Sequence, residues 1–117
     1  MIKIYQTKQG KITICCSDKN LSIGLLELNP RNVLLKHNRP VIEELVQVCG
    51  SSIIKLFENG KIEKKIILNN GDKIKISANQ YHIHSNPTNK ESITLWKFEG
   101  DITKIIKDIE ENNKKIF

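Results

Sequence analysis

The chain has 117 residues, a length typical of one domain that can bury its own core, and we expect a single domain over residues 1–117. It contains 38% hydrophobic and 27% charged residues, with no apolar run long enough to cross a bilayer, which argues against a membrane-spanning protein. The first residues have neither the apolar segment nor the cleavage site of a secretion signal, so the sequence predicts a soluble, cytoplasmic protein without a membrane partner.

The net charge of +6 comes mainly from lysine, because Arg31 and Arg39 are the only arginines. Several lysines alternate with isoleucine, as at Lys73 and Lys75, a pattern typical of the solvated face of a β-sheet. The chain has no cluster of aromatic and basic residues of the kind on which nucleic-acid bases stack. We therefore expect no nucleic-acid partner.

The three cysteines, Cys15, Cys16 and Cys49, do not have the spacing of a zinc-binding motif. Cys15 and Cys16 are adjacent, and neighbouring side chains on a strand point to opposite faces, so they cannot bind one ion together. An odd number of cysteines in such a chain predicts reduced, buried thiols.

Short runs with strand character recur along the chain and are separated by turn-forming residues. Asn59-Gly60 lies between two of these runs and is the strongest short-range hairpin signal, because a type I′ turn needs positive φ at both central residues. The predicted strands cover residues 11–16, 23–28, 32–37, 44–49, 52–58, 61–68, 73–76, 81–85 and 92–98. Short strands at this spacing, with no helix between them, predict an all-β antiparallel sandwich or barrel over about residues 11–98.

The hydrophobic period changes after Gly100. Asp101 supplies a capping carboxylate, and isoleucines follow at the spacing of one helical face, at Ile102, Ile105, Ile106 and Ile109. The pattern predicts one amphipathic helix over about residues 101–114, packed on the outside of the sheet or on a partner subunit.

The most informative segment is residues 71–86, GDKIKISANQYHIHSN. His82 and His84 are two residues apart in a run with β-strand character, so their side chains share one face. If that face lies inside a barrel, the two imidazoles and Asn86 can converge on a metal ion or an anionic ligand.

The spacing of this segment resembles the second of two short motifs of the cupin family, G-x5-P-x-G-x2-H-x3-N. Gly71, His82 and Asn86 are in register, whereas Ser77 replaces the proline and Asn79 replaces the glycine. Asn79 is a mild replacement, because asparagine is the residue after glycine that best tolerates positive φ.

The first cupin motif, G-x5-H-x-H-x3,4-E-x6-G, aligns with residues 31–50. His37, Glu43 and Gly50 match it, but Arg31 stands in place of the glycine and Arg39 in place of the second histidine. The two motifs occur in order in an all-β chain, so the resemblance implies a double-stranded β-helix, or jelly-roll barrel, with one C-terminal α-helix added.

By this resemblance the barrel interior binds a divalent metal such as Fe, Mn, Zn or Ni through His37, Glu43 and His82. His84 would be a fourth ligand or would support the others. Two histidines and one carboxylate are sufficient for a facial triad with open coordination positions. Arg39 cannot be a ligand, because its guanidinium stays charged and raises the cost of binding a cation beside it. We expect no organic cofactor.

Arg39, Gln47 and Asn86 are the candidate ligand-binding residues. Arg39 lies in an inward-facing register and suits bidentate capture of a carboxylate or phosphate, or it pairs at the barrel rim with Glu43 or Glu44. Only one of these two glutamates can face the interior, and Gln47 shares the face of Glu43. Asn86 precedes a proline and is also expected to brace that turn.

The resemblance implies a protein that binds a small anionic or carbohydrate-like metabolite in the barrel. Isomerase, epimerase or dioxygenase chemistry would suit the family, but the residues alone do not choose among them. The alternative is a metal-free, non-catalytic ligand-binding or dimeric assembly module. Isoleucines on the outer sheet faces, together with the apolar stripe of the helix, predict a homodimer.

Overall fold

Strands account for most of the computed structural model, which describes all residues from 1 to 117. The strands are β1 (Lys3–Gln6), β2 (Gly10–Ser17), β3 (Leu21–Leu28), β4 (Glu43–Cys49), β5 (Ser52–Glu58), β6 (Lys61–Leu68), β7 (Lys73–Ile76), β8 (His82–Ser85), β9 (Ser92–Glu99) and β10 (Lys114–Lys115), and the helix is α1 (Thr103–Asn112). Seven strands form one sheet in the order β10-β1-β2-β3-β9-β4-β7, and three form a second in the order β6-β5-β8. All pairings are antiparallel, so the all-β jelly-roll prediction is confirmed.

The alternation of side chains decides which face of each strand is buried. Along β9, Thr94, Trp96 and Phe98 are buried, while the residues between them are partly exposed. The same alternation in β3 and β4 builds one apolar core between the two sheets. Gly24 of β3 leaves room for the indole ring of Trp96, because a side chain at this position would collide with the ring. These alternating patterns are those that a half-buried antiparallel sheet requires.

Local structure agrees with most of the predicted strands and departs from them in two places. Asn59 and Gly60 have φ values of 51° and 79°, so the predicted hairpin turn is present. Residues 32–37 form isolated bridges to β8 instead of a strand, because the pairing is irregular between Val33↔Ser85 and His37↔His82. The sequence analysis also missed β1, a four-residue strand that pairs with β2 and β10.

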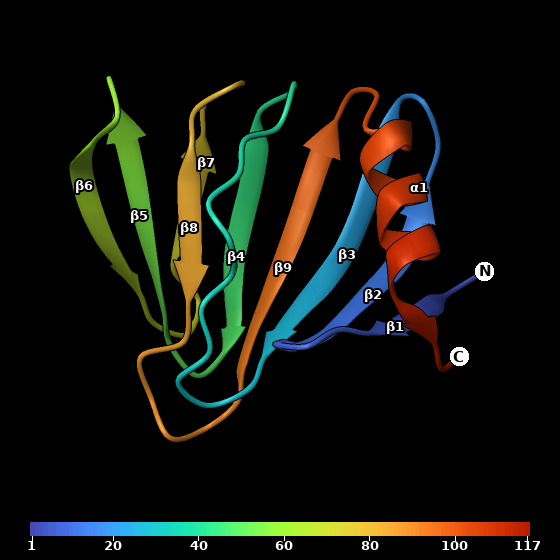
Figure 1. Ribbon diagram of the computed structural model, residues 1–117, viewed down its shortest axis with the longest axis horizontal. Helices are drawn as coiled ribbons and strands as arrows, with labels where there is room; N and C mark the ends of the chain where they lie inside the picture. The colour runs from blue at the N-terminus through green and yellow to red at the C-terminus, as the bar shows by residue number, and fades with distance from the viewer.

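Helix α1 packs on the inner face of the large sheet, so its predicted position on the outer face or on a partner subunit is wrong. In Figure 1 the small sheet lies beside β4 and β7, whereas α1 lies at the other end of the large sheet against β2 and β3. Ile102 and Ile106 are buried in the same core cluster as Leu26 and Trp96. The helix thus supplies the part of the second layer that the small sheet does not cover. Ile102 and Ile106 of its apolar stripe are buried within the chain, whereas Ile105 and Ile109 are partly exposed.

Polar contacts and a short strand pairing hold α1 in this position. Glu110 Oε2 accepts hydrogen bonds from Lys3 Nζ at 2.9 Å and from Tyr5 Oη at 3.0 Å. The helix starts at Thr103, whose backbone N–H donates to Asp101 Oδ1 at 2.9 Å. It ends at Asn112 instead of residue 114, because Lys114 belongs to β10, which pairs with β1. Contacts to β1 therefore fix the helix from both its side and its end.

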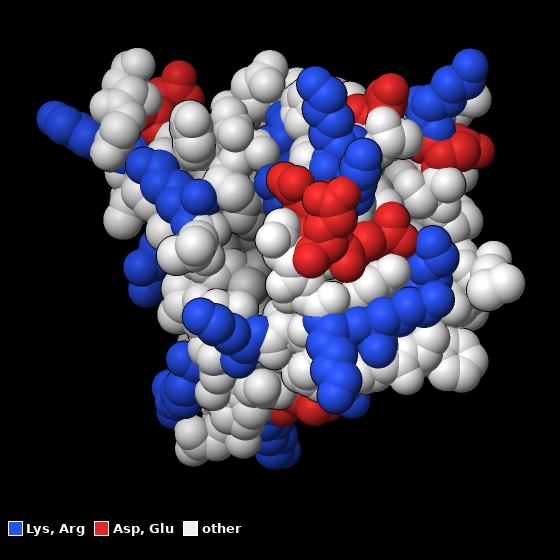
Figure 2. Space-filling model, turned by 45° about the vertical axis from the view of Figure 1, so that its right-hand side comes forward, with Lys and Arg blue, Asp and Glu red and all other residues white.

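The surface carries charges of both signs. Figure 2 shows lysine and arginine side chains distributed over one face and bordering a cluster of acidic ones. Cys16 and Cys49 are exposed and Cys15 is partly exposed, so the expectation of buried thiols is wrong, although all three are free. Cys15 lies at a bulge, because the register between β2 and β3 shifts between Ile14 and Cys16. The structure has no helix long and apolar enough to span a bilayer.

Asn79 adopts the positive φ that its place in the motif predicts, with φ of 64°. Its backbone N–H donates to the carbonyl oxygen of Arg39 at 2.6 Å, and its own carbonyl accepts from Asn38 Nδ2 at 3.3 Å. Asn79 thereby ties the segment after β7 to the loop that carries Arg39. Arg31, at the other glycine position, also has positive φ, and its guanidinium donates to the carbonyl of Pro87.

We expect Asn79→Ala to lower the free energy of unfolding by about 1 kcal/mol, because a Cβ without a local hydrogen-bonding group disfavours left-handed backbone. Asn79→Gly, the matched variant, should be neutral or slightly stabilising since glycine adopts this φ freely. Urea unfolding of the three proteins measures the difference. Equal stabilities of the alanine and glycine variants would contradict the assignment.

Candidate metal centre

Four side chains with metal-binding groups meet between the two sheets. His37 comes from the loop between β3 and β4, Glu43 begins β4, and His82 and His84 lie on β8. Their ligand atoms all lie within 4.8 Å of one another. The strand register explains the meeting: residues two apart on β8 share the inner face, and the bridge His37↔His82 places the loop histidine opposite that strand.

The cluster is largely buried. His82, His84 and Glu43 expose 1%, 3% and 5% of their surface, respectively, and His37 is half-buried. Glu44 lies on the opposite face of β4, near Lys75, and is partly exposed. Of the two adjacent glutamates, Glu43 is therefore the one that faces the interior.

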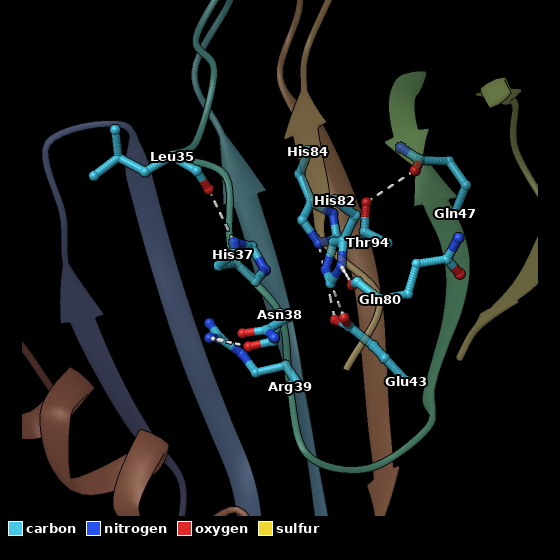
Figure 3. Close-up of polar contacts among 10 residues, drawn as sticks. All are labelled: Leu35, His37, Asn38, Arg39, Glu43, Gln47, Gln80, His82, His84 and Thr94. Carbon is cyan, nitrogen blue, oxygen red and sulfur yellow. Dashed lines mark hydrogen bonds and ion pairs between the residues drawn. The ribbon is translucent and has the colours of Figure 1, made fainter. Parts of the chain in front are cut away.

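Backbone carbonyl groups orient two of the imidazole rings. His82 Nδ1 lies 2.9 Å from the carbonyl oxygen of Gln80, and His37 Nδ1 lies 2.9 Å from that of Leu35 (Figure 3). Since a carbonyl oxygen only accepts, each Nδ1 carries a proton, and in the neutral ring Nε2 presents a lone pair. Such an outer hydrogen bond is the usual support of a histidine that binds metal through its other nitrogen.

Two buried polar atoms at the centre lack a hydrogen-bond partner: Glu43 Oε1 and His82 Nε2. They face each other at 3.0 Å, and Glu43 Oε2 lies 3.9 Å from His84 Nε2. When Nδ1 of His82 carries the ring proton, both facing atoms are acceptors, and only a cation between them or a proton on His82 makes the contact favourable. Buried acceptors in this arrangement fit a metal ion.

Burial keeps two of the histidines neutral. It lowers the pKa of His84 well below its usual value, with further lowering by the neighbouring His82, His37 and Arg39. Burial first, then Arg39 and His82, lowers the pKa of His37 to about 3. Neutral imidazole is the form that binds metal, so these rings need not lose a proton to do so near neutral pH.

A cavity of about 70 Å³ lies between this cluster and α1. Nine of its thirteen lining residues are apolar, and its polar lining consists of His37, Arg39, Glu43 and His84. Arg39 donates from Nη1 to the carbonyl oxygen of Asn38 at 3.2 Å and forms no ion pair with either Glu43 or Glu44. The rim pairing that the sequence left open is thus not formed, and the guanidinium faces the cavity.

Gln47 does not line the cavity. Its Oε1 accepts hydrogen bonds from Ser52 Oγ at 2.7 Å and Thr94 Oγ1 at 2.9 Å, and its Nε2 donates to Ser92 Oγ and to the carbonyl of Cys49. This network joins β4, β5 and β9 at the end of the core away from Glu43 (Figure 3). Because its amide is fully used, we assign Gln47 a structural role in place of the predicted ligand contact.

Asn86 is likewise used by the scaffold. Its Nδ2 donates to the carbonyl oxygens of Leu28, Asn29 and Lys90, and its Oδ1 accepts from the backbone N–H and the hydroxyl of Thr88. These bonds brace the turn that follows β8, as the sequence predicted. They leave no group of Asn86 for the predicted contact with a ligand.

The sequence analysis missed the contribution of α1 to the site. Ile105 and Ile109 line the cavity opposite the histidines, together with Trp96. The isoleucine spacing revealed that one helical face is buried. Nothing in that spacing indicates what the face is buried against.

Several solved structures are similar to this chain in fold. The Lactobacillus farciminis oxalate decarboxylase formate complex is 21% identical over 86% of this chain and 32% of its own, with a TM-score of 0.77. The Bacillus subtilis oxalate decarboxylase, studied for its Mn(II) centres, is 20% identical over 81% of this chain and 27% of its own, with a TM-score of 0.73. An oxalate oxidase in complex with glycolate is 15% identical over 69% of this chain and 42% of its own, with a TM-score of 0.64.

These enzymes are cupins, and the chain has the cupin fold that its two motifs suggested. It spans less than half the length of each of those three chains. No family model matches the sequence, and no curated protein resembles it in sequence. The likeness to the oxalate enzymes is therefore one of fold.

The neutral histidines predict a pH-dependent stability for the metal-free protein. Because the pKa of His37 falls from 6.5 to about 3 on folding, the unfolded chain binds more protons between these values, and stability decreases as the pH falls through that window. The loss is up to about 1.4 kcal/mol per pH unit for His37. Urea unfolding with a chelator at pH 7, 6 and 5 measures it, and His37→Gln should show a shallower dependence. Equal slopes in both proteins would contradict the buried neutral state.

Proposed function

We propose that the protein is a metal-binding cupin in which His37, Glu43, His82 and His84 hold one divalent cation beside a small-ligand cavity. The observation that carries the proposal is the pair of unpartnered buried atoms, Glu43 Oε1 and His82 Nε2, which face each other at 3.0 Å. Two donors bound at about 2.1 Å and at a right angle to one metal ion lie about 3 Å apart. The pair already has that separation.

The donor set favours some metals over others. Three imidazole nitrogens and one carboxylate suit iron, nickel, zinc and manganese. A four-coordinate zinc ion would have all its positions filled by the four side chains, whereas a six-coordinate ion keeps positions for a ligand. The cavity borders His37, Glu43 and His84, so an ion with open positions would meet the ligand there. We therefore favour Fe, Mn or Ni over Zn.

A second function has one observation in its favour. His82 and Glu43 would form a buried ion pair at 3.0 Å if a proton occupied His82 Nε2. The protein would then be a metal-free binding module in which Arg39 alone captures an anion. The two functions differ in a measurable quantity, the metal content of the folded protein.

We expect the purified protein, reconstituted separately with Fe, Mn, Ni and Zn and then desalted, to retain about one metal ion per chain. Glu43→Gln and His82→Gln should each weaken binding by more than about 100-fold, since loss of even an outer hydrogen-bond partner costs 10–100-fold. Glu44→Gln is the matched control, because Glu44 lies on the opposite face of β4. Elemental analysis and titration with a competing chelator measure the retained metal and its affinity.

The metal should also stabilise the fold. Binding to the native state alone adds about 2.7 kcal/mol when free metal exceeds its dissociation constant 100-fold. Thermal unfolding should therefore shift upward with metal in the wild-type protein and in Glu44→Gln, but not in Glu43→Gln. A folded wild-type protein that retains none of the four metals would overturn the metal centre and leave the ion-paired module.

A further inference from the structure

The wall of the cavity opposite the histidines is apolar. Four of its nine apolar residues come from α1 and the residue before it: Ile102, Ile105, Ile106 and Ile109. Trp96 and Phe98 continue this surface on β9. A ligand in the cavity would thus have polar partners on one side only.

Arg39 is the one cationic side chain that lines this cavity. It uses one donor on the carbonyl of Asn38, and its remaining N–H groups have no protein partner. Figure 3 draws its guanidinium on the side of the loop away from Glu43. A half-buried guanidinium with free donors is suited to bidentate binding of a carboxylate.

The charge balance points to the same ligand. A divalent cation beside Glu43 and neutral imidazoles leaves one positive charge, and Arg39 adds another. A bound anion would offset this excess, whereas a neutral sugar or an amine would not.

The size of the cavity limits the ligand. Its volume of about 70 Å³ is small beside the roughly 300–1,000 Å³ of pockets for drug-sized ligands. A small ligand suits this volume better than a sugar phosphate does.

We propose that the ligand is a short aliphatic monocarboxylate, with its carboxylate on Arg39 and its alkyl chain against the isoleucines of α1. This inference rests on the proposed metal centre, beside which the carboxylate would lie. It makes α1, a segment outside both cupin motifs, the element that selects the ligand. Oxalate has six non-hydrogen atoms as butyrate does, but it has a second carboxylate where the cavity is apolar.

The test is calorimetric titration of the metal-loaded protein with acetate, butyrate and oxalate. Butyrate should bind about tenfold more tightly than acetate, because its two additional methylene groups are buried. Butyrate should also bind more tightly than oxalate. These comparisons use the wild-type protein, so they do not depend on the folding of any variant.

Two variants test the carboxylate contact and the alkyl-chain contact of the ligand separately. Arg39→Gln should weaken acetate and butyrate alike by at least about tenfold, with Arg31→Gln as control, since Arg31 bonds to Pro87 outside the cavity. Ile109→Ala should reduce the preference for butyrate over acetate to within about threefold while leaving metal content unchanged, with the exposed Ile67→Ala as control.

Metal content is measured first on every sample, so the two proposals fail in different ways. A metal-loaded protein that prefers oxalate to butyrate, or binds butyrate equally well after Arg39→Gln, would overturn the ligand assignment alone. If elemental analysis finds that the protein retains no metal, the proposed metal centre is overturned, whatever the titration shows.

Discussion

The carboxyl group of Glu43 lies inside the protein among imidazoles, and the geometry of the site depends on how that burial is compensated. Burying such a group without a compensating partner costs several kcal/mol. No lysine or arginine forms an ion pair with it, because Arg39 turns toward the cavity and Lys75 reaches only Glu44. The compensation must come from His82 and His84 and, in the proposed site, from the cation that they would share with Glu43. The registers of β4 and β8 keep these groups together.

Features governed by local rules could be predicted from the sequence. Period-two alternation placed His82 and His84 on one face, and the turn at Asn59-Gly60 follows from the φ values that its residues tolerate. Asn79 follows the same rule, since it stands where the motif needs left-handed backbone. Most strands were found because their boundaries are marked by such turns. The convergence of the four candidate ligands followed from this register once the cupin fold was assumed.

Features that depend on distant partners could not be predicted. The hydrophobic stripe of α1 shows that one face is buried, but its position on the inner face of the sheet depends on Lys3 and Tyr5, far away in sequence. Gln47 shares the face of Glu43, as predicted, yet its amide oxygen accepts hydrogen bonds from hydroxyl groups of β5 and β9. Burial of a polar side chain was predictable, but the identity of its partner was not.

The replacement of the second motif histidine by Arg39 can be understood together with His84. A cupin that lost an imidazole at this position would keep only two, and a charged guanidinium would oppose the metal. His84 supplies the third imidazole from the same strand face as His82, within 4.8 Å of the other donors. Position 39 is thereby free to carry a charge directed at the cavity, while α1 provides an apolar wall on the far side of it. In the proposed site, β4, β8 and the first-motif loop bind the metal, and Arg39 and α1 together select what binds beside it.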